Sequence, residues 1–399
     1  MHSTPEHSGA GALPRPALEL CDIVRAHSAA LARTRALTPE QARTLRAIGR
    51  CRTAALGGHL DVCTDCGHQS PSYNSCRDRH CPKCQWLAQA RWVQRRTERL
   101  LPVPYFHVVF TLPAELRAIA MLNRRLVFDT LFASASSTLL TLGRDPKRLG
   151  ALLGVTTVLH TWTRDLRFHP HVHCIVTGGG WSIAEQRFKR SRAAYLFPIR
   201  VLGALFRGKV LAALDDAHRR GVLRLPDDLA DPLAFPQLRA TLSKTSWVTY
   251  AKRPFGGPEQ VVRYLGRYTH RVGISNRRLV SMDERAVTFR TKDGKTASVE
   301  PVAFLARFIQ HVLPARFVKI RHYGLLAPAR VGTQLEHARA HLEGRAPSEV
   351  VKERPTPPDG ATLVRELAGI DITLCRACGA RAVEPHPLAR APPATKAIA

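Results

Sequence analysis

The sequence predicts an α+β protein in which helices flank an antiparallel sheet and a small helical metal-binding domain comes first along the chain. Residues 167–176, RFHPHVHCIV, alternate in the way that strand side chains do. Residues 202–217 carry apolar side chains at the spacing of a helix. Two CxxC pairs follow one another within residues 63–84, a spacing typical of structural zinc sites in small domains.

Composition changes along the chain predict its division into segments. The region after about residue 334 is rich in proline and charge, which is typical of linkers and disordered tails. We expect a disordered tail over residues 1–16, a metal-binding domain over 17–101, a larger α+β domain over 102–335 with a helical insertion at about 181–242, and a linker with a C-terminal CxxC tail over 336–399, of which 385–399 is expected to be disordered.

The N-terminal domain is predicted to be mostly helical. Residues 18–33 have helical periodicity. The sequence Thr38-Pro39-Glu40-Gln41 is a capping box with proline in the first turn, so a second helix should run from there to about Ile48. A third helix is expected after Cys84.

Apolar runs bounded by proline and glycine predict the elements of the larger domain. The run from Gly178 to Gly180 is interpreted as a turn. Strands are expected at 105–111, 154–161, 166–177 and 246–251, helices at 113–142, 202–217 and 301–312, and a meander at 277–300 with Asp293-Gly294 as a hairpin turn.

The alternating strand places its histidines on one face. His169, His171 and His173 point away from the core-like side chains between them. Because Pro170 lacks a backbone donor and suits a strand entry or an edge, His169 is expected just outside the ladder. His171 and His173 are the pair expected to hold a divalent metal with a third ligand from elsewhere. A lone HxH is more often a polar cluster on a half-exposed strand, and His160 is interpreted as a surface histidine.

A second motif, YxxxY, lies in a predicted helix from about Pro258 to Arg271. At four-residue spacing this helix displays two neighbouring stripes, one of Gln260, Tyr264 and Tyr268 and one of Arg263, Arg267 and Arg271. Alone, two such tyrosines would be interpreted as half-buried packing residues. Beside a histidine-bearing strand in a basic chain, they indicate chemistry.

The two motifs together indicate a metal-assisted tyrosine nucleophile that acts on nucleic acid. A phenol has a pKa of about 10, so it attacks poorly unless its proton is removed and the charge of the phosphodiester is offset. A metal on His171 and His173 would polarise the phosphate, and the arginines would bind its oxygens. Attack would leave a 5′-phosphotyrosine and a free 3′-hydroxyl, from which the strand can be rejoined without ATP.

These residues resemble those of a known family. The segments VLHTWTRDLRFHPHVHCIVTGGG and WVTYAKRPFGGPEQVVRYLGRYTHRVGISNRRL are similar to the two-tyrosine HUH transposases of rolling-circle insertion sequences, the IS91 type. CGHQSPSYNSCRDRHCPKCQ resembles the N-terminal zinc-binding domain of that family, and FVKIRHYGLL resembles its later catalytic segment. The resemblance runs from about Leu20 to Leu326.

The resemblance implies a five-stranded HUH nuclease core in residues 102–335, cleavage of single-stranded DNA at element ends with transfer to a target, and Mg or Mn as the catalytic metal. In related enzymes the third metal ligand is a polar side chain near the tyrosine helix, so Gln260 is preferred over Glu259 and His169. The resemblance places the other ligands at His171 and His173 and the nucleophiles at Tyr264 and Tyr268, and we expect DNA contacts from Arg263, Arg267, Arg271 and Lys252.

Composition agrees with a protein that handles DNA. The chain has 60 Lys+Arg against 31 Asp+Glu, a net charge of +29, which favours polyanions and predicts binding that weakens with salt. Charge alone would equally fit a ribosomal or membrane-surface protein. No stretch approaches 18 apolar residues and the N-terminus lacks the apolar core of a signal peptide, so we expect a cytoplasmic, nucleoid-associated protein without a membrane partner.

In the cytoplasm the ten cysteines indicate metal ligands rather than disulfides. Cys375-x2-Cys378 is half of a zinc site that another half, in this chain or in a partner, could complete. For the N-terminal domain we expect one tetrahedral zinc site of Cys63, Cys66, Cys81 and Cys84, with Cys76 and His80, and also Cys51 and His59, as possible ligands of this or a second site.

Two other functions fit parts of the sequence. A zinc-containing DNA-binding protein would need no tyrosine chemistry, and a replication initiator would use the same nicking reaction. The N-terminal cysteine domain and the lack of a helicase P-loop motif in the sequence favour the transposase. A carboxylate-based transposase would need three acidic metal ligands in place of the HxH and YxxxY pair.

Overall fold

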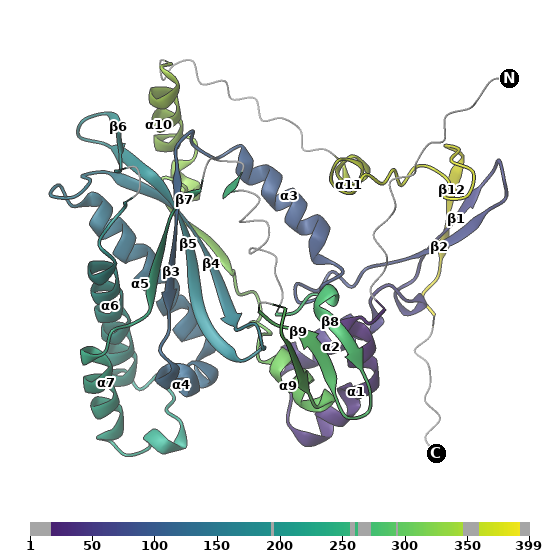
Figure 1. The fold of residues 1–399 in the computed structure, drawn as a ribbon, viewed down its shortest axis with the longest axis horizontal. Coiled ribbons are helices and arrows are strands. Elements are labelled where there is room, and N and C mark those ends of the chain that lie inside the picture. Colours follow the sequence, from purple (N-terminus) through teal and green to yellow (C-terminus); the bar gives the residue numbers. More distant parts are fainter. Residues whose placement is uncertain are drawn as a thin grey trace. The chain divides into compact units, whose positions relative to one another are not determined.

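The computed structural model describes residues 17–192, 195–255, 260–261, 273–292, 294–345 and 359–391 (Figure 1). The chain forms two compact units, one from Met1–Trp92, His270–Ile309 and Pro355–Ala399 and the other from Val93–Thr269 and Gln310–Arg354. This division differs from the predicted series of consecutive segments, because the chain returns twice to the first unit after leaving it.

An antiparallel sheet forms the centre of the second unit. Its strands lie in the order β11-β4-β5-β3-β7, and β6 pairs with β5 beside this path. They span Tyr105–Thr111 (β3), Leu152–Trp162 (β4), Phe168–Ser182 (β5), Arg187–Arg190 (β6), Thr249–Phe255 (β7) and Ile320–Gly324 (β11). The predicted α+β class is confirmed, and the strands expected at 154–161 and 166–177 are present as β4 and β5, which pair with one another.

Helices cover one face of this sheet (Figure 1). The core lies between them and the sheet, where Phe110 of β3 packs on Phe206 of α6 with ring centroids 4.7 Å apart and Leu159 of β4 is fully buried. The helices are α4 (Arg117–Leu122), α5 (Arg124–Arg144), α6 (Ile199–Arg219) and α7 (Ala234–Lys244). Because strand side chains alternate, the residues between these core positions lie on the opposite face of the sheet.

The helix predicted over 113–142 is divided at Asn123. The Asn123 Nδ2 group donates hydrogen bonds to the carbonyl oxygens of Ile119 (2.9 Å) and Arg224 (2.7 Å), and its Oδ1 accepts one from the Arg224 amide (2.9 Å). These bonds hold the chain after α6 against the α4–α5 junction, so the break serves the packing of the helical layer.

Helix α5 is long and apolar enough to cross a membrane by length and composition. In the structure 61% of its most apolar window is buried, and the helix packs against β4, β5 and α6. Its hydrophobicity is therefore that of the central helix of a packed core.

The glycine run predicted as a turn is instead part of β5, which there pairs with β4 and β6. A Cβ atom at Gly179 would lie 2.3 Å from the carbonyl oxygen of Lys189, and one at Gly180 would lie 2.5 Å from that of Leu152. The neighbouring backbones approach so closely that no residue larger than glycine fits. The glycines therefore continue β5 and its pairing with both neighbours.

The first unit contains the helices predicted for the N-terminal domain. It also contains the predicted meander and the helix after it, which were expected in the larger domain of residues 102–335. Helix α9 packs on α1, and Phe304 of α9 meets Phe289 of β9 edge-on at 5.5 Å between ring centroids. The capping box is confirmed, since the Thr38 hydroxyl accepts from the Gln41 amide at 3.3 Å. The elements are α1 (Leu20–Thr34), α2 (Pro39–Arg50), α9 (Pro301–Ile309), β8 (Leu279–Met282), β9 (Val287–Arg290) and β10 (Thr296–Val299).

A small sheet joins the two ends of the first unit. Strands β1 (Gly58–Cys63) and β2 (Gln69–Tyr73) form a hairpin, and β12 (Val383–Leu388) pairs antiparallel with β1. The predicted disorder over 385–399 is therefore wrong at its start. The prolines that suggested disorder, Pro385 and Pro387, are tolerated because β12 is an edge strand.

The remaining elements are short connections and terminal helices. The helix predicted after Cys84 is confirmed as α3 (Gln85–Thr97), whereas residues 346–358 of the predicted linker lie outside the described residues. The others are α10 (Gln334–Glu343), α11 (Gly360–Ala368), η1 (Ala54–Leu56), η2 (Ala114–Leu116), η3 (Asp227–Leu229), η4 (Asn276–Arg278) and η5 (Pro328–Arg330).

The glycines of β5 lead to a stability prediction. Gly179→Ala should lower the free energy of unfolding by about 2–4 kcal/mol, because the new Cβ meets a carbonyl oxygen and because φ is +144°. Urea denaturation measures the loss. The control is Gly208→Ala on α6, where nothing lies within 4 Å of the added atom and a gain of up to about 1 kcal/mol is expected. Equal losses in both variants would contradict the close approach of the strands.

Candidate active site and cysteine clusters

The histidine strand has the alternation that the sequence predicts. Along β5, Phe168, Val172 and Cys174 are buried in the core, whereas His171 and His173 are half-buried on the opposite face. The register of the neighbouring strands determines what else lies on that face, because residues directly opposite one another share a side of the sheet.

The neighbouring strand β4 adds a third histidine. His160 lies directly opposite His171, and its ring centroid lies 4.4 Å from that of His173. One ring nitrogen from each of the three histidines falls within 4.8 Å of the other two. The interpretation of His160 as a surface residue is wrong, since its exposed fraction is 3%. The sheet thus gathers three imidazoles where the sequence motif supplied two.

Hydrogen bonds orient two of these rings. The His171 Nδ1 group donates to the carbonyl oxygen of His169 at 2.7 Å, which leaves Nε2 as the ring atom that can accept a hydrogen bond or bind a metal. The Nδ1 atom of His173 lies 2.8 Å from Nε2 of His107, and the planes of the two rings are parallel, with a 1° interplanar angle. His107 stands on β3, the next strand of the sheet. Such partners fix ring orientation in metal sites.

Burial keeps the imidazoles of His171 and His107 neutral near pH 7. Burial lowers the pKa of His171 to about 4. Burial, with smaller contributions from the neighbouring Lys252 and His171 side chains, lowers the pKa of His107 to about 4 as well. Neutral imidazole is the form that binds a metal, so near pH 7 His171 needs to lose no proton to become a ligand.

Two basic side chains border the histidine group. Lys252, predicted to contact DNA, lies on β7 directly opposite His107 and is exposed, with its Nζ 5.9 Å from the Tyr250 ring centroid. At the other end, the Arg117 Nη2 group lies 3.4 Å from His169 Nδ1. Nothing in the local sequence singled out Arg117, because its proximity depends on how α4 packs.

The tyrosine helix lies largely outside the described residues. This applies to Tyr264 and Tyr268 and to Arg263, Arg267 and Arg271. Of the predicted helix, Gln260 and Val261 are described, with the Gln260 side chain exposed and the Val261 side chain buried. The role of Gln260 as the third metal ligand stays a prediction.

The cysteines form two groups of four instead of the predicted one. Cys63 and Cys66 lie with Cys375 and Cys378, whereas Cys81 and Cys84 lie with Cys51 and Cys76. The prediction paired the two nearest CxxC motifs in sequence, but β1 and β2 carry the first motif toward β12. The His80 ring, a suggested ligand, lies 3.0 Å from the Asp78 carboxylate, and His59 lies 3.3 Å from Asp61.

The first cysteine cluster, Cys51, Cys76, Cys81 and Cys84, has the spacing of a tetrahedral metal site. Its Sγ atoms lie 3.4 Å apart between Cys51 and Cys84, 3.5 Å between Cys76 and Cys84, and 3.7 Å between Cys81 and Cys51. Four sulfurs bound to zinc at 2.3 Å would be about 3.8 Å apart, whereas a disulfide would bring two of them to about 2.0 Å. The donor set therefore fits a closed structural zinc site.

Comparison with known proteins shows the class to which this combination belongs. Residues 154–334 match a family model described as "Putative transposase", and residues 23–112 match one described as "Transposase zinc-binding domain". His160, His171 and His173 lie in the first matched region, and the first cysteine cluster lies in the second. The protein is a transposase with an N-terminal zinc-binding domain, and its substrate is DNA.

Two relatives extend this result over most of the chain. The chain is 43% identical over 376 residues to "Putative transposase y4qJ" of Sinorhizobium fredii, covering 92% of this chain and 94% of the relative. It is 29% identical over 351 residues to "Transposase for insertion sequence element IS801" of Pseudomonas savastanoi pv. phaseolicola, covering 84% and 80%. The chain belongs to the IS91-type transposases. No solved structure matches it.

The buried His322 of β11 makes the free energy of unfolding depend on pH. It bonds Thr156 of β4 (Nδ1 to Oγ1, 3.0 Å), and burial, with added repulsion from Arg96 and Arg99, lowers its pKa to about 3. In the unfolded chain a histidine has a pKa of about 6.5, so on acidification the unfolded state takes up the proton first. The free energy of unfolding should therefore fall between about pH 6.5 and pH 3.

Urea denaturation at pH 7, 5 and 4 measures this contribution. His322→Gln should lose less stability over that interval than the wild type, because the titrating group is gone. His386→Gln, which changes an exposed histidine of β12, is the control and should follow the wild type. Identical acid sensitivity of all three proteins would contradict the assignment to His322.

Proposed function

We propose that this transposase nicks single-stranded DNA at the ends of its element and transfers it through 5′-phosphotyrosine linkages, in a metal-assisted rolling-circle reaction. The observation that carries the proposal is that His160, His171 and His173 lie together on one face of the sheet. The His107 ring contacts that of His173. Strand β7, which pairs with the strand of His107, leads directly into the segment that contains Tyr264 and Tyr268.

In the proposed step a tyrosine Oη attacks the scissile phosphorus and the bond from phosphorus to the 3′ oxygen breaks. The tyrosine gives up its proton, the departing oxygen takes one up as a 3′-hydroxyl, and the phosphate stays bonded to the tyrosine. The reverse reaction with another 3′-hydroxyl joins strands without an external energy source. Two tyrosines, Tyr264 and Tyr268, allow two such linkages at once, which strand transfer requires.

Three imidazoles would hold the catalytic metal at His160, His171 and His173, and the bound cation would offset charge on the phosphate as a Lewis acid. An all-nitrogen donor set suits Mn²⁺ better than Mg²⁺, which prefers oxygen ligands. Lys252 and Arg117, which border the histidine group, are placed to bind neighbouring phosphates of the strand, a role that we also propose for Arg263, Arg267 and Arg271.

We assign structural zinc to the first cysteine cluster. Cys51 follows the last turn of α2 and Cys84 directly precedes α3, so one ion there would fix the two helices of a domain that has a small apolar core. This replaces the predicted grouping of Cys81 and Cys84 with Cys63 and Cys66. The enzyme would act on the DNA of the nucleoid in the cytoplasm.

Covalent trapping tests the reaction. A single-stranded oligonucleotide that contains an element end is incubated with the protein and Mn²⁺, labelled at its 3′ end in one sample and at its 5′ end in another. Because the tyrosine retains the 5′ phosphate, only the 3′-labelled strand should migrate with the protein in a denaturing gel. The 5′-labelled product should be a shorter free strand that a polymerase can extend.

Phenylalanine variants connect the adduct with the motif. Tyr264→Phe with Tyr268→Phe should abolish it, and each single change should impair transposition. Tyr195→Phe, a change of an exposed tyrosine elsewhere in the same unit, is the control and should react normally. Undiminished adduct in the double variant would refute the tyrosine mechanism, and DNA binding without any adduct from the wild type would favour a purely DNA-binding role.

Metal binding tests the third ligand. His160→Ala should weaken Mn²⁺ binding at least tenfold, and His107→Phe should weaken it by about 10–100-fold, since it removes the partner that orients His173. Electron paramagnetic resonance of unbound Mn²⁺ gives the affinities. His218→Ala, on α6 against Phe235, is the control. If His160→Ala bound Mn²⁺ as tightly as the wild type and Gln260→Ala bound it much more weakly, the third metal ligand would be Gln260 and not His160.

A further inference from the structure

The second cysteine cluster, Cys63, Cys66, Cys375 and Cys378, lies partly outside both matched family models, which end at residues 112 and 334. We propose that it holds a second structural zinc ion, which fastens the C-terminal segment of the chain to the N-terminal zinc-binding domain. This site is independent of the nicking chemistry proposed above.

The sulfur positions fit one tetrahedral ion. Sγ of Cys63 lies 3.7 Å from that of Cys378, and Sγ of Cys66 lies 3.7 Å from that of Cys375, against about 3.8 Å for four sulfurs around zinc. All four sulfurs lie within 4.8 Å of one another. Every cysteine of the chain is a free thiol, and the separations are far above a disulfide bond length.

The two halves of the site have the same backbone construction. In the first loop the Cys63 amide donates to the carbonyl oxygen of His68 (2.9 Å), and the Gly67 amide donates to that of Cys63 (2.9 Å). The second loop repeats both bonds. Gly67 has φ of +69°, a conformation that favours glycine after the second cysteine.

In the C-terminal loop the Cys375 amide donates to the carbonyl oxygen of Ala380 (2.8 Å), and the Gly379 amide donates to that of Cys375 (2.9 Å), with φ of +79° at Gly379. The two loops share the sequence CxxCG, whereas Cys84 is followed by Gln85. Matching geometry at both ends of the chain indicates a pair of zinc knuckles built for one ion.

The flanking strands hold the knuckles together. Strand β12 pairs with β1 from Gly58 opposite Leu388 to Cys63 opposite Val383, and the Thr64 amide donates to the carbonyl oxygen of Ala382 at 2.8 Å. The ladder therefore ends where the sulfurs meet. An ion at that end would lock an edge strand that contains two prolines and little buried surface.

The backbone around Cys375 suits a metal ligand. The Ala377 amide donates a hydrogen bond to Sγ of Cys375 at 3.4 Å. Such a donor stabilises a thiolate, which is the form that binds zinc.

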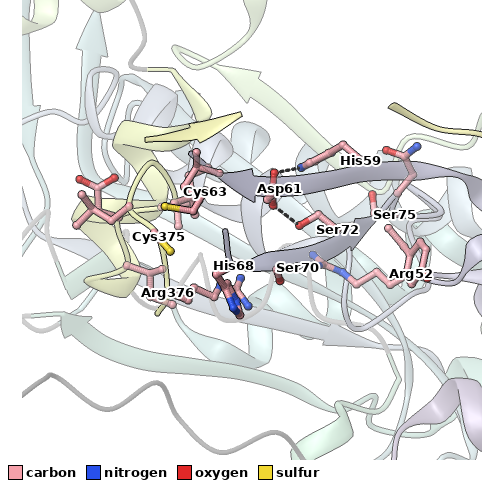
Figure 2. A pocket seen from close by; sticks show the side chains of 18 residues that line it. Arg52, His59, Asp61, Cys63, His68, Ser70, Ser72, Ser75, Cys375 and Arg376 are labelled. Carbon is pink, nitrogen blue, oxygen red and sulfur yellow. Dashed lines mark hydrogen bonds and ion pairs between the residues drawn. The ribbon is translucent and has the colours of Figure 1, made fainter. Parts of the chain in front are cut away.

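The C-terminal segment also completes a pocket of about 670 Å³ (Figure 2). One wall is the β1–β2 hairpin, where the Asp61 carboxylate accepts from the Ser72 hydroxyl at 3.0 Å and lies 3.3 Å from His59 Nε2. Cys375 and Arg376 stand on the opposite wall. Release of the second ion would therefore remove one side of this pocket along with β12.

Zinc counting on the full-length protein tests the proposal. The wild type should contain two zinc ions per chain by inductively coupled plasma mass spectrometry. Cys375→Ser with Cys378→Ser should contain one, Cys63→Ser with Cys66→Ser should also contain one, and all four changes together should still leave one. Arg376→Gln, in the same loop but with every thiol intact, is the matched control and should keep two.

The alternative arrangement gives a different pattern. If Cys63 and Cys66 shared an ion with Cys81 and Cys84, loss of the C-terminal thiols would change nothing, and two zinc ions in that variant would overturn the proposal. One zinc ion in the wild type, or iron in place of the second zinc, would overturn it as well.

Two measurements keep the test decisive if the paired variants fail to fold. Cys378→His replaces an exposed thiol ligand with an imidazole and should retain two zinc ions. X-ray absorption on the wild type should show four sulfurs around each zinc at about 2.3 Å. Two such sites need eight cysteines. The first hundred residues contain only seven, and Cys174 is buried in the core of the sheet, so this result requires a thiol of the C-terminal pair. Oxygen or additional nitrogen ligands at half of the zinc would contradict the all-sulfur second site.

Discussion

The antiparallel register of β4, β5 and β3 is the constraint on which the rest of the site depends. It places His160 opposite His171 and brings His107 beside His173, while the alternate residues of the same strands fill the core under α5 and α6. A shift of one residue in any of these strands would send its histidine into the core and an apolar side chain toward the site. The packing of the core and the geometry of the histidines are therefore determined together.

Much of this arrangement could be predicted from the sequence. Alternation along residues 167–176 correctly predicted the strand, and the spacing of His171 and His173 predicted that their rings lie together on one face, because both signals are local. His160 and His107 could not be assigned in the same way. Their roles depend on which strands are neighbours and in which register, and neither property is visible in a single strand.

The cysteines show the same limit with a different cause. Proximity in sequence favoured one site of four residues in the N-terminal domain, yet β1 and β2 direct Cys63 and Cys66 toward the C-terminal segment. A local signal was present, since only two of the CxxC motifs continue into glycine and these two pair in the structure. The third strand of the small sheet, β12, was not predicted because its prolines indicated disorder. An edge strand accepts prolines that an inner strand excludes.

The most direct test of the account is peptide mapping of the trapped DNA adduct. Trypsin cleaves after Arg263, Arg267 and Arg271, so Tyr264 and Tyr268 fall in the separate peptides YLGR and YTHR. After nuclease trimming, mass spectrometry should find a phosphonucleotide on one or both of these peptides when Mn²⁺ is present, and on neither when His160 and His171 are replaced by alanine. A nucleotide on another residue, or undiminished labelling in the histidine variant, would contradict the account.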